Sequence, residues 1–301
     1  MKPPISYYGG KQKIARKIIK LIPKHTVYVE PFAGGAAILF MKPDYRTNNQ
    51  ADYREVINDK DELLINFYRV LQDNPEPLIN KLQLTLYSRA EHNKAKTILK
   101  NSNDYSALEK AWAYYVQIFQ SFSTILFGVW RISTIEQNIA NTWNNKVEGL
   151  GNYIKRMKGI HVESIDAIEC IKKWDSPQTL FYCDPPYMNA NQGYILKYSL
   201  EQQQELIDTL NNIQGSFLLS GYDDENIIIS DNWERFSFEA FCSASGQGIR
   251  RSDKTKKATK EEIGNRKRIE VVWRKISNIT PRPEILKIYE KTKHLFNPLE
   301  R

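Results

Sequence analysis

Short apolar runs and amphipathic segments alternate along most of this 301-residue chain. Apolar segments with period 3.6 predict helices at residues 11–22, 36–41, 61–71 and 165–174. Brief runs rich in β-branched and aromatic residues predict buried strands at residues 26–29, 55–59, 161–163, 179–183 and 216–220. Because strands and helices alternate, we expect an α/β domain with a mainly parallel sheet.

The middle of the chain has a different pattern. Residues 69–155 show helical periodicity and polar stretches but no convincing buried strand, and residues 107–119 form the clearest helix. Residues 141–146 are rich in asparagine and predict a polar loop. We therefore expect one discontinuous α/β domain, residues 1–68 and 156–301, interrupted by a mostly helical insertion at 69–155.

The last third of the chain predicts one helix and a closing hairpin. Ser199 and Gln202 have the spacing of a capping box, which marks the start of a helix. Residues 233–241 and 268–273 alternate apolar and polar side chains, as the two strands of an antiparallel pair do.

Composition narrows the class of protein. Hydrophobic residues make up 41% and charged residues 26%, an ordinary globular mixture. No apolar run approaches the roughly 18 residues of a membrane span. The three cysteines, Cys170, Cys183 and Cys242, have neither disulfide-framework nor metal-ligand spacing. We expect a cytoplasmic protein in a reducing environment, without a metal centre or membrane partner.

The net charge of +8 is concentrated in two segments. Residues 1–24 carry +7 and residues 245–275 carry +7, whereas residues 25–244 carry −8. Two local basic stretches favour a polyanionic partner, although solvated basic faces would give the same pattern.

Chemistry-bearing residues follow three of the predicted strands, where ligands bind in open α/β sheets. Glycines lie in residues 31–35, and Asp59 can accept hydrogen bonds from ribose hydroxyls. The dinucleotide fingerprint G-x-G-x-x-G is absent, and Gln12 replaces the Ser/Thr of a phosphate loop after Gly9-Gly10-Lys11. Asp184-Pro185-Pro186-Tyr187 is the most specific motif, whose alternative interpretation is a rigid turn.

Four segments carry a resemblance to a known family. Residues 7–11 (YYGGK), 28–35 (YVEPFAGG), 57–59 (IND) and 181–187 (FYCDPPY) resemble, in the same order, motifs of the D12 class of DNA adenine-N6 methyltransferases. The predicted insertion stands where that family keeps its target-recognition domain.

The resemblance implies a fold, a cofactor and its binding residues. The fold would be a Rossmann-like methyltransferase sheet with a reversed last hairpin, and the cofactor S-adenosylmethionine. Ala167 departs from the family pattern, which often has Phe there, next to a cofactor-adenine position. The cofactor-binding residues implied are Tyr7, Tyr8, Gly10, Lys11, Glu30, Pro31, Phe32, Ala33, Gly34, Asp59, Asp166 and Asp184.

The resemblance also implies the reaction, transfer of a methyl group to N6 of a flipped-out adenine in duplex DNA. The catalytic residues would be Asp184, Pro185, Pro186 and Tyr187. The Asp184 carboxylate and the Pro185 carbonyl would accept hydrogen bonds from the adenine amine, and Tyr187 would stack on the base. The alternatives are cytosine-N4 methylation and a catalytically inert DNA-binding relative.

Two segments are candidates for DNA contact. Residues 121–131 combine aromatic and small residues, and Arg131 could reach a guanine edge or a phosphate. The basic segment between the hairpin strands could clamp the DNA backbone. The DNA-binding residues we expect are Ser121, Ser123, Arg131, Arg250, Arg251, Lys254, Lys256 and Lys257. A separate restriction endonuclease is a possible partner.

Overall fold

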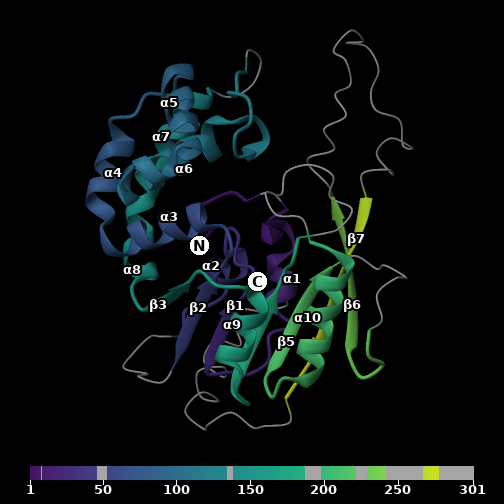
Figure 1. Ribbon diagram of the computed structural model, residues 1–301. Coiled ribbons are helices and arrows are strands. Elements are labelled where there is room, and N and C mark those ends of the chain that lie inside the picture. Colours follow the sequence, from purple (N-terminus) through teal and green to yellow (C-terminus); the bar gives the residue numbers. More distant parts are fainter. Residues whose placement is uncertain are drawn as a thin grey trace, which may run out of the picture.

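The computed structural model describes residues 1–7, 9–45, 53–133, 138–186, 198–221, 229–241 and 267–277. Its centre is a seven-stranded sheet with the order β3-β2-β1-β4-β5-β7-β6 (Figure 1). The strands are β1 Val27–Glu30, β2 Arg54–Asn58, β3 Ile160–Glu163, β4 Thr179–Cys183, β5 Ser216–Gly221, β6 Glu234–Phe241 and β7 Lys267–Lys275. Strands β1 to β5 are parallel, whereas β7 is antiparallel to both β5 and β6. The predicted α/β fold and its reversed hairpin are confirmed.

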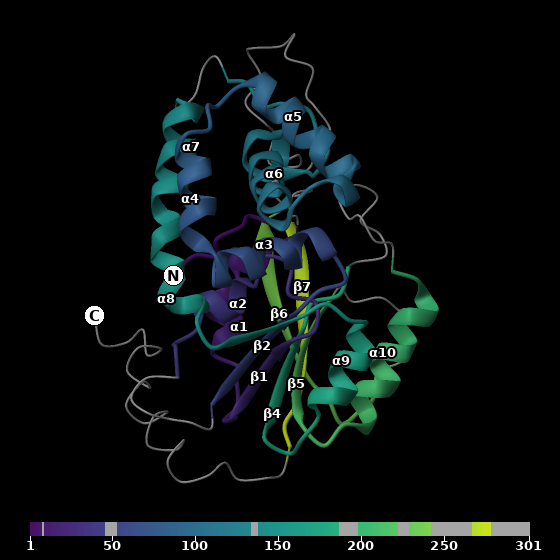
Figure 2. The ribbon, with the colours of Figure 1, turned by 60° about the vertical axis from the view of Figure 1, so that its left-hand side comes forward.

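Helices cover both faces of the sheet (Figure 2). The first face packs against α1 Ala15–Ile19, α2 Ala37–Met41 and α3 Glu62–Asp73. The second face packs against α9 Ala167–Trp174 and α10 Leu200–Asn212. Side chains of a strand point to alternate faces, so Leu180 and Tyr182 join the first core whereas Phe181 and Cys183 join the second. Double coverage explains why β4 is apolar throughout.

A group of helices lies between α3 and β3 in the sequence and gathers at one end of the sheet (Figures 1 and 2). It contains α4 Pro75–Gln83, α5 Arg89–Lys100, α6 Ala107–Gln120 and α7 Ile139–Glu148, and α8 Tyr153–Met157 leads back to the sheet. Helix α6 begins at the Ser106–Glu109 capping box and is buried at every position from Ala111 to Gln120. Because α6 is buried on all its sides over this stretch, it is the central helix of the group, and the other helices of the group pack around it.

Two sequence predictions differ from the structure. The polar loop expected at residues 141–146 is wrong, because those residues lie in α7. Asn138 caps that helix, and the side chains that enter the core are Trp143 and Val147, one helical turn apart. The single helix expected at residues 11–22 is instead a 3₁₀ turn, Lys11–Lys13, followed by the short α1.

No helix among the described residues has the length and apolar character needed to cross a bilayer. The Ser199–Gln202 capping box predicted from the sequence starts α10 and is confirmed.

Candidate active site

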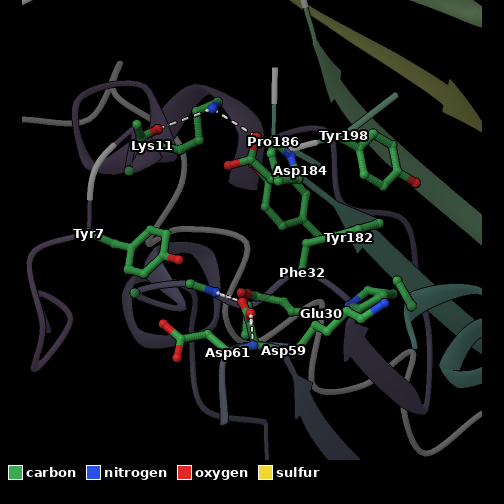
Figure 3. A pocket seen from close by; sticks show the side chains of 18 of the residues that line it. Tyr7, Lys11, Glu30, Phe32, Asp59, Asp61, Tyr182, Asp184, Pro186 and Tyr198 are labelled. Atoms are coloured by element: carbon green, nitrogen blue, oxygen red, sulfur yellow. Dashed lines mark hydrogen bonds and ion pairs between the residues drawn. The ribbon is translucent and has the colours of Figure 1, made fainter. Parts of the chain in front are cut away.

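The carboxyl ends of β1, β2 and β4 meet at one cavity (Figure 3). These strands are adjacent and parallel, so residues that are far apart in the sequence end at the same edge of the sheet. Glu30 ends β1, Asp59 follows β2 and Asp184 follows β4. The residues predicted from sequence that line this cavity are Tyr7, Gly10, Lys11, Glu30, Pro31, Phe32, Ala33, Gly34, Asp59, Asp166, Asp184 and Pro186.

The glycine-containing loop after β1 is held in a conformation that glycine favours. Gly34 has a φ of +47°, and a Cβ atom there would lie 3.0 Å from the ring of Tyr7. Its N–H donates to Asp59 Oδ2 at 2.8 Å, and its carbonyl accepts from the Tyr68 hydroxyl at 3.0 Å. The Tyr7 ring therefore packs directly on a loop whose shape is fixed by hydrogen bonds to Asp59, which follows β2, and from Tyr68 of α3.

Asp59 is a nearly buried carboxylate with capacity left for a ligand. Its Oδ2 accepts from Gly34 N–H, and its Oδ1 accepts from Asp61 N–H at 3.0 Å. Burial raises the pKa of Asp59 to about 6, although these two backbone donors act in the opposite direction. A carboxylate offers about four lone-pair sites, so Asp59 can also accept a hydrogen bond from a ligand hydroxyl.

Asn58 is a buried residue that ties together the loops around the cavity. Its Nδ2 donates to Pro31 O at 2.9 Å and to Ile165 O at 3.1 Å, while its Oδ1 accepts from Ile165 N–H at 3.0 Å. One side chain thus joins the loops after β1, β2 and β3. The sequence motif includes Asn58 but predicts no role for it, because one of its partners, Ile165, lies 107 residues further along the chain.

Glu30 lies at the base of the cavity and is buried. Its Oε1 accepts from the Tyr28 hydroxyl at 2.8 Å and from Leu39 N–H, an otherwise unpaired donor in the first turn of α2, at 2.7 Å. Burial raises the pKa of Glu30 to about 8 despite both hydrogen bonds. This carboxyl group is therefore mostly protonated at pH 7.

Asp184 forms an ion pair on the opposite wall of the cavity (Figure 3). Lys11 Nζ lies 2.8 Å from Asp184 Oδ1 and donates to Gly9 O at 3.2 Å. Tyr182, two residues before Asp184, lines the same cavity, and its hydroxyl bonds to Ser220 Oγ at 3.0 Å. Cys183 between them is fully buried in the second core, and burial raises the pKa of its thiol.

A third wall of the cavity is formed by one acidic residue, Asp166, and the aromatic rings of Phe32 and Tyr198. Asp166 caps α9 by accepting from Ile168 N–H at 2.9 Å, and its other oxygen lies 3.7 Å from Lys60 Nζ. The Phe32 ring meets Tyr198 edge to face with ring centres 5.7 Å apart. Tyr198 also lines the cavity and had not been singled out from the sequence, although it directly precedes the Ser199–Gln202 capping box.

Several predicted residues do not line this cavity. Pro185 is buried and is not part of the cavity lining. The others, Tyr8, Tyr187, Arg250, Arg251, Lys254, Lys256 and Lys257, lie outside the described residues. Among the residues that the structure describes, no group of His, Cys, Asp or Glu could hold a metal ion.

The loop after α6 forms a small hairpin within the helical insertion. Ser121 pairs with Trp130 as an isolated bridge, and Phe122 N–H donates to Val129 O at 2.8 Å. The predicted DNA contact Ser121 is turned inward, with its Oγ bonded to His92 Nε2 at 2.9 Å. Ser123 is exposed and Arg131 half-buried.

Helix α5 and the residues before it hold this hairpin in place. Lys96 Nζ donates to Phe127 O at 2.8 Å, and the Tyr87 hydroxyl donates to Arg131 O at 2.6 Å. Because these anchors fix the backbone, the exposed side chains of Phe122 and Val129 are presented to solvent from a rigid support.

The reversed hairpin and the carboxylates grouped around one cavity define a Rossmann-like methyltransferase. A family model for the D12 class of N6 adenine-specific DNA methyltransferases matches residues 7–240, which is most of the chain. The chain belongs to this family and is therefore an adenine-specific DNA methyltransferase.

Relatives with assigned names agree with this membership. The type II methyltransferase M1.LlaDCHI of Lactococcus lactis subsp. cremoris is 26% identical over 244 residues, which cover 73% of this chain and 80% of the relative. The type II methyltransferase M.MjaIII of Methanocaldococcus jannaschii is 24% identical over 210 residues, covering 64% of this chain and 71% of the relative.

Proposed function

We propose that this protein transfers a methyl group from S-adenosylmethionine to N6 of an adenine flipped out of duplex DNA, with Asp184 as the catalytic residue. The observation that carries the proposal is the position of Asp184. It stands at the end of β4, on the wall of the cavity that faces Asp59 and the loop after β1. A base that enters from this side would meet a carboxylate at the place where the methyl donor binds.

The residues of the cavity fit S-adenosylmethionine. The Asp59 carboxylate can accept a hydrogen bond from a ribose hydroxyl, and Phe32 offers an aromatic face beside the acid Asp166. Gly10, Lys11, Glu30 and the loop after β1 line the part of the cavity that would hold the methionine end. When bound, this cofactor supplies a methyl group on a positively charged sulfonium, which departs as a neutral thioether.

The protein's own groups position and activate the amine. The lone pair of an adenine amine is delocalised into the ring, so the amine is a weak nucleophile. Hydrogen bonds from the amine to the Asp184 carboxylate and the Pro185 carbonyl favour a pyramidal nitrogen with an available lone pair. Asp184 also accepts the proton that leaves the methylated nitrogen. The two prolines restrict the loop that carries these acceptors, and Tyr187 stacks on the flipped base.

Sequence recognition is assigned to the helical insertion, residues 69–155. The anchored hairpin after α6 supports this, because it displays Ser123 and Phe122 from a rigid backbone. The basic segment that contains Lys254, Lys256 and Lys257 would hold the phosphate backbone without reading bases. Both relatives are named type II methyltransferases, which supports a restriction–modification setting, and a separate endonuclease would be the partner in that setting.

The experiment compares Asp184→Ala with Asp208→Ala, an exposed aspartate on α10 that serves as the matched control. With tritiated S-adenosylmethionine, we expect Asp184→Ala to abolish methyl transfer while DNA binding stays within about twofold of the wild type. The control should retain full activity. Near-normal transfer by Asp184→Ala would overturn the catalytic assignment.

Two further measurements separate the alternative activities. A nucleoside digest of the product should contain N6-methyladenine, and N4-methylcytosine in its place would mean a different target base. Calorimetry should detect S-adenosylmethionine binding, and its absence would indicate an inert relative.

A further inference from the structure

The hairpin at residues 121–131 is held in a strained backbone conformation. Three of its residues that are not glycine, Ser123, Thr124 and Phe127, have φ values of +57°, +56° and +62°. L-residues rarely adopt this left-handed region, because their Cβ atom crowds the following carbonyl oxygen. Such residues gather at functional sites and persist only where the surrounding structure holds them. The contacts around this hairpin therefore decide whether it keeps its shape.

Helix α5 supplies two of these contacts from one of its faces. Lys96 Nζ donates to Phe127 O at 2.8 Å, so a charged donor holds the carbonyl of a residue with positive φ. One turn earlier on α5, the His92 imidazole is bonded to Ser121 Oγ at 2.9 Å, where the hairpin begins. Hydrogen bonds to charged groups are stronger than those between neutral groups, so Lys96 is a strong anchor for the turn of the hairpin.

The residues at the start of α5 hold the other end of the hairpin. The Tyr87 hydroxyl donates to Arg131 O at 2.6 Å, and the rings of Tyr87 and Trp130 have their centres 5.5 Å apart. The guanidinium group of Arg89 lies 5.0 Å from the centre of the same Trp130 ring. Lys96 and Tyr87 therefore fix the hairpin at two separate points, its turn and its end.

The anchored hairpin presents two exposed side chains next to its strained bonds. Phe122 is 59% exposed, and Ser123, which follows it, is exposed and has a positive φ. Without the anchors, the strained residues can relax to common φ values, because nothing then offsets the cost of the left-handed region. The exposed side chains would then take several orientations in place of one.

We propose that Lys96 and Tyr87 are positioning residues for recognition of the target sequence. They hold residues 121–131 in one conformation, which fits the target site and fits poorly to sites that differ from it by one base pair. This inference rests on the proposed role of the helical insertion in sequence recognition. A hairpin with several conformations loses contacts at the target site and tolerates other sites, so discrimination falls. Cofactor binding is kept, because neither residue lines the cavity at the ends of β1, β2 and β4.

The test measures the preference of the enzyme among DNA sites. Plasmid DNA without adenine methylation is incubated with S-adenosylmethionine and limiting enzyme, and methylation at each adenine is followed over time by sequencing with modified-base detection. The sequence that the wild type methylates fastest defines the target site. The rate at this site divided by the mean rate at sites with one changed base pair is the discrimination ratio.

Two variants each remove one anchor. Lys96→Met removes the donor to Phe127 O, and Tyr87→Phe removes only the hydroxyl that binds Arg131 O. We expect the discrimination ratio to fall at least tenfold in Lys96→Met and at least threefold in Tyr87→Phe. The larger loss is comparable to the effect of one mismatched base pair, which costs on the order of tenfold to a hundredfold in binding. The affinity for S-adenosylmethionine, measured by calorimetry, should stay within twofold of the wild type.

Two control variants remove the same chemical groups elsewhere in the helical insertion. Lys100→Met takes the same charge from the exposed end of α5, and Tyr105→Phe takes a hydroxyl from a half-buried residue between α5 and α6. Both should keep the discrimination ratio within twofold of the wild type. Thermal unfolding followed by circular dichroism shows whether each variant folds. Tyr87→Phe keeps the ring that packs on Trp130, so it tests the inference even if Lys96→Met does not fold.

Two results would overturn the inference. The first is a smaller fall of the discrimination ratio than expected in Tyr87→Phe or in folded Lys96→Met, with rates lowered by one factor at all sites, as a merely structural role would give. The second is a fall in Lys100→Met as large as in Lys96→Met, which would assign the effect to charge. The proposed function would fail differently, since a wild type that methylates no adenine or an active Asp184→Ala variant would refute it regardless of the hairpin.

Discussion

Replacing Glu30 by Gln should stabilise the protein at neutral pH. The amide oxygen of Gln can accept the same hydrogen bonds from the Tyr28 hydroxyl and Leu39 N–H that Glu30 Oε1 accepts now. The substitution changes the side-chain volume little. It also removes a buried carboxyl group whose protonation in the folded state lowers the free energy of unfolding at neutral pH. The difference between the two proteins should therefore report the electrostatic cost of Glu30 alone.

The magnitude follows from proton linkage. The pKa of Glu30 is about 8 in the folded protein against 4.5 for an ordinary glutamate. Between these values the folded state binds the proton that the unfolded state releases, so stability falls as pH rises from 4.5 to 8. Each pH unit in this window costs about 1.4 kcal/mol, which amounts to about 3 kcal/mol at pH 7. Below pH 4.5 both states are protonated and the cost disappears.

The assay is urea unfolding followed by tryptophan fluorescence at pH 5, 6, 7 and 8. The gain in unfolding free energy from Glu30→Gln should be small at pH 5 and rise to about 3 kcal/mol at pH 7. Glu148→Gln, at the exposed C-terminal end of α7, removes a charge without burial and is the control. If Glu30→Gln is less stable than the wild type at pH 7, or its gain does not depend on pH, the reasoning is refuted.

Three other predictions concern the cofactor site, the helical insertion and the basic segment. Asp59→Asn should weaken S-adenosylmethionine binding about tenfold or more by calorimetry, because hydrogen bonds to a charged acceptor contribute about 1.5–3 kcal/mol, and unchanged affinity would contradict the assigned role. Trp143→Ala should lower the unfolding free energy by about 3–5 kcal/mol, since the ring is buried and bonded to Thr85 O; a loss below about 1 kcal/mol would mean that α7 does not contribute to the core. Replacing Lys254, Lys256 and Lys257 together by Gln should make the slope of log affinity for DNA against log salt less steep by roughly 2–3, and an identical slope would exclude phosphate contacts by this segment.

The sequence predicted the sheet well because its strands have a strong local signature. A strand that is buried on both faces, such as β4, is continuously apolar, and the acids that follow β2 and β4 mark the ligand-binding edge. Strand–helix alternation then leaves few topologies to consider. The position of the cavity lined by Asp59 and Asp184 can therefore be predicted from the sequence.

Other features depend on contacts that no local pattern records. The asparagine-rich segment of α7 resembles a loop, and it is helical because Trp143 and Val147 pack into the insertion. Aromatic residues around α6 look alike in the sequence, yet Tyr115 is buried and Phe122 is 59% exposed. Glu270 has no motif around it and reaches Lys11 only because β7 runs against β5.

The position of the insertion has a consequence for how the chain folds. Strands β2 and β3 are neighbours in the sheet, yet the chain between them contains the whole helical insertion, about a hundred residues. The loop-closure entropy of such a span rises only slowly with its length, by about 0.6 kcal/mol for each doubling. The contacts among α4, α5, α6 and α7 join segments that are closer in sequence than β2 and β3, so we expect them to form first and to shorten the distance that β3 must cover. During synthesis, therefore, the helical insertion should be structured before the edge of the sheet that holds β3 can close.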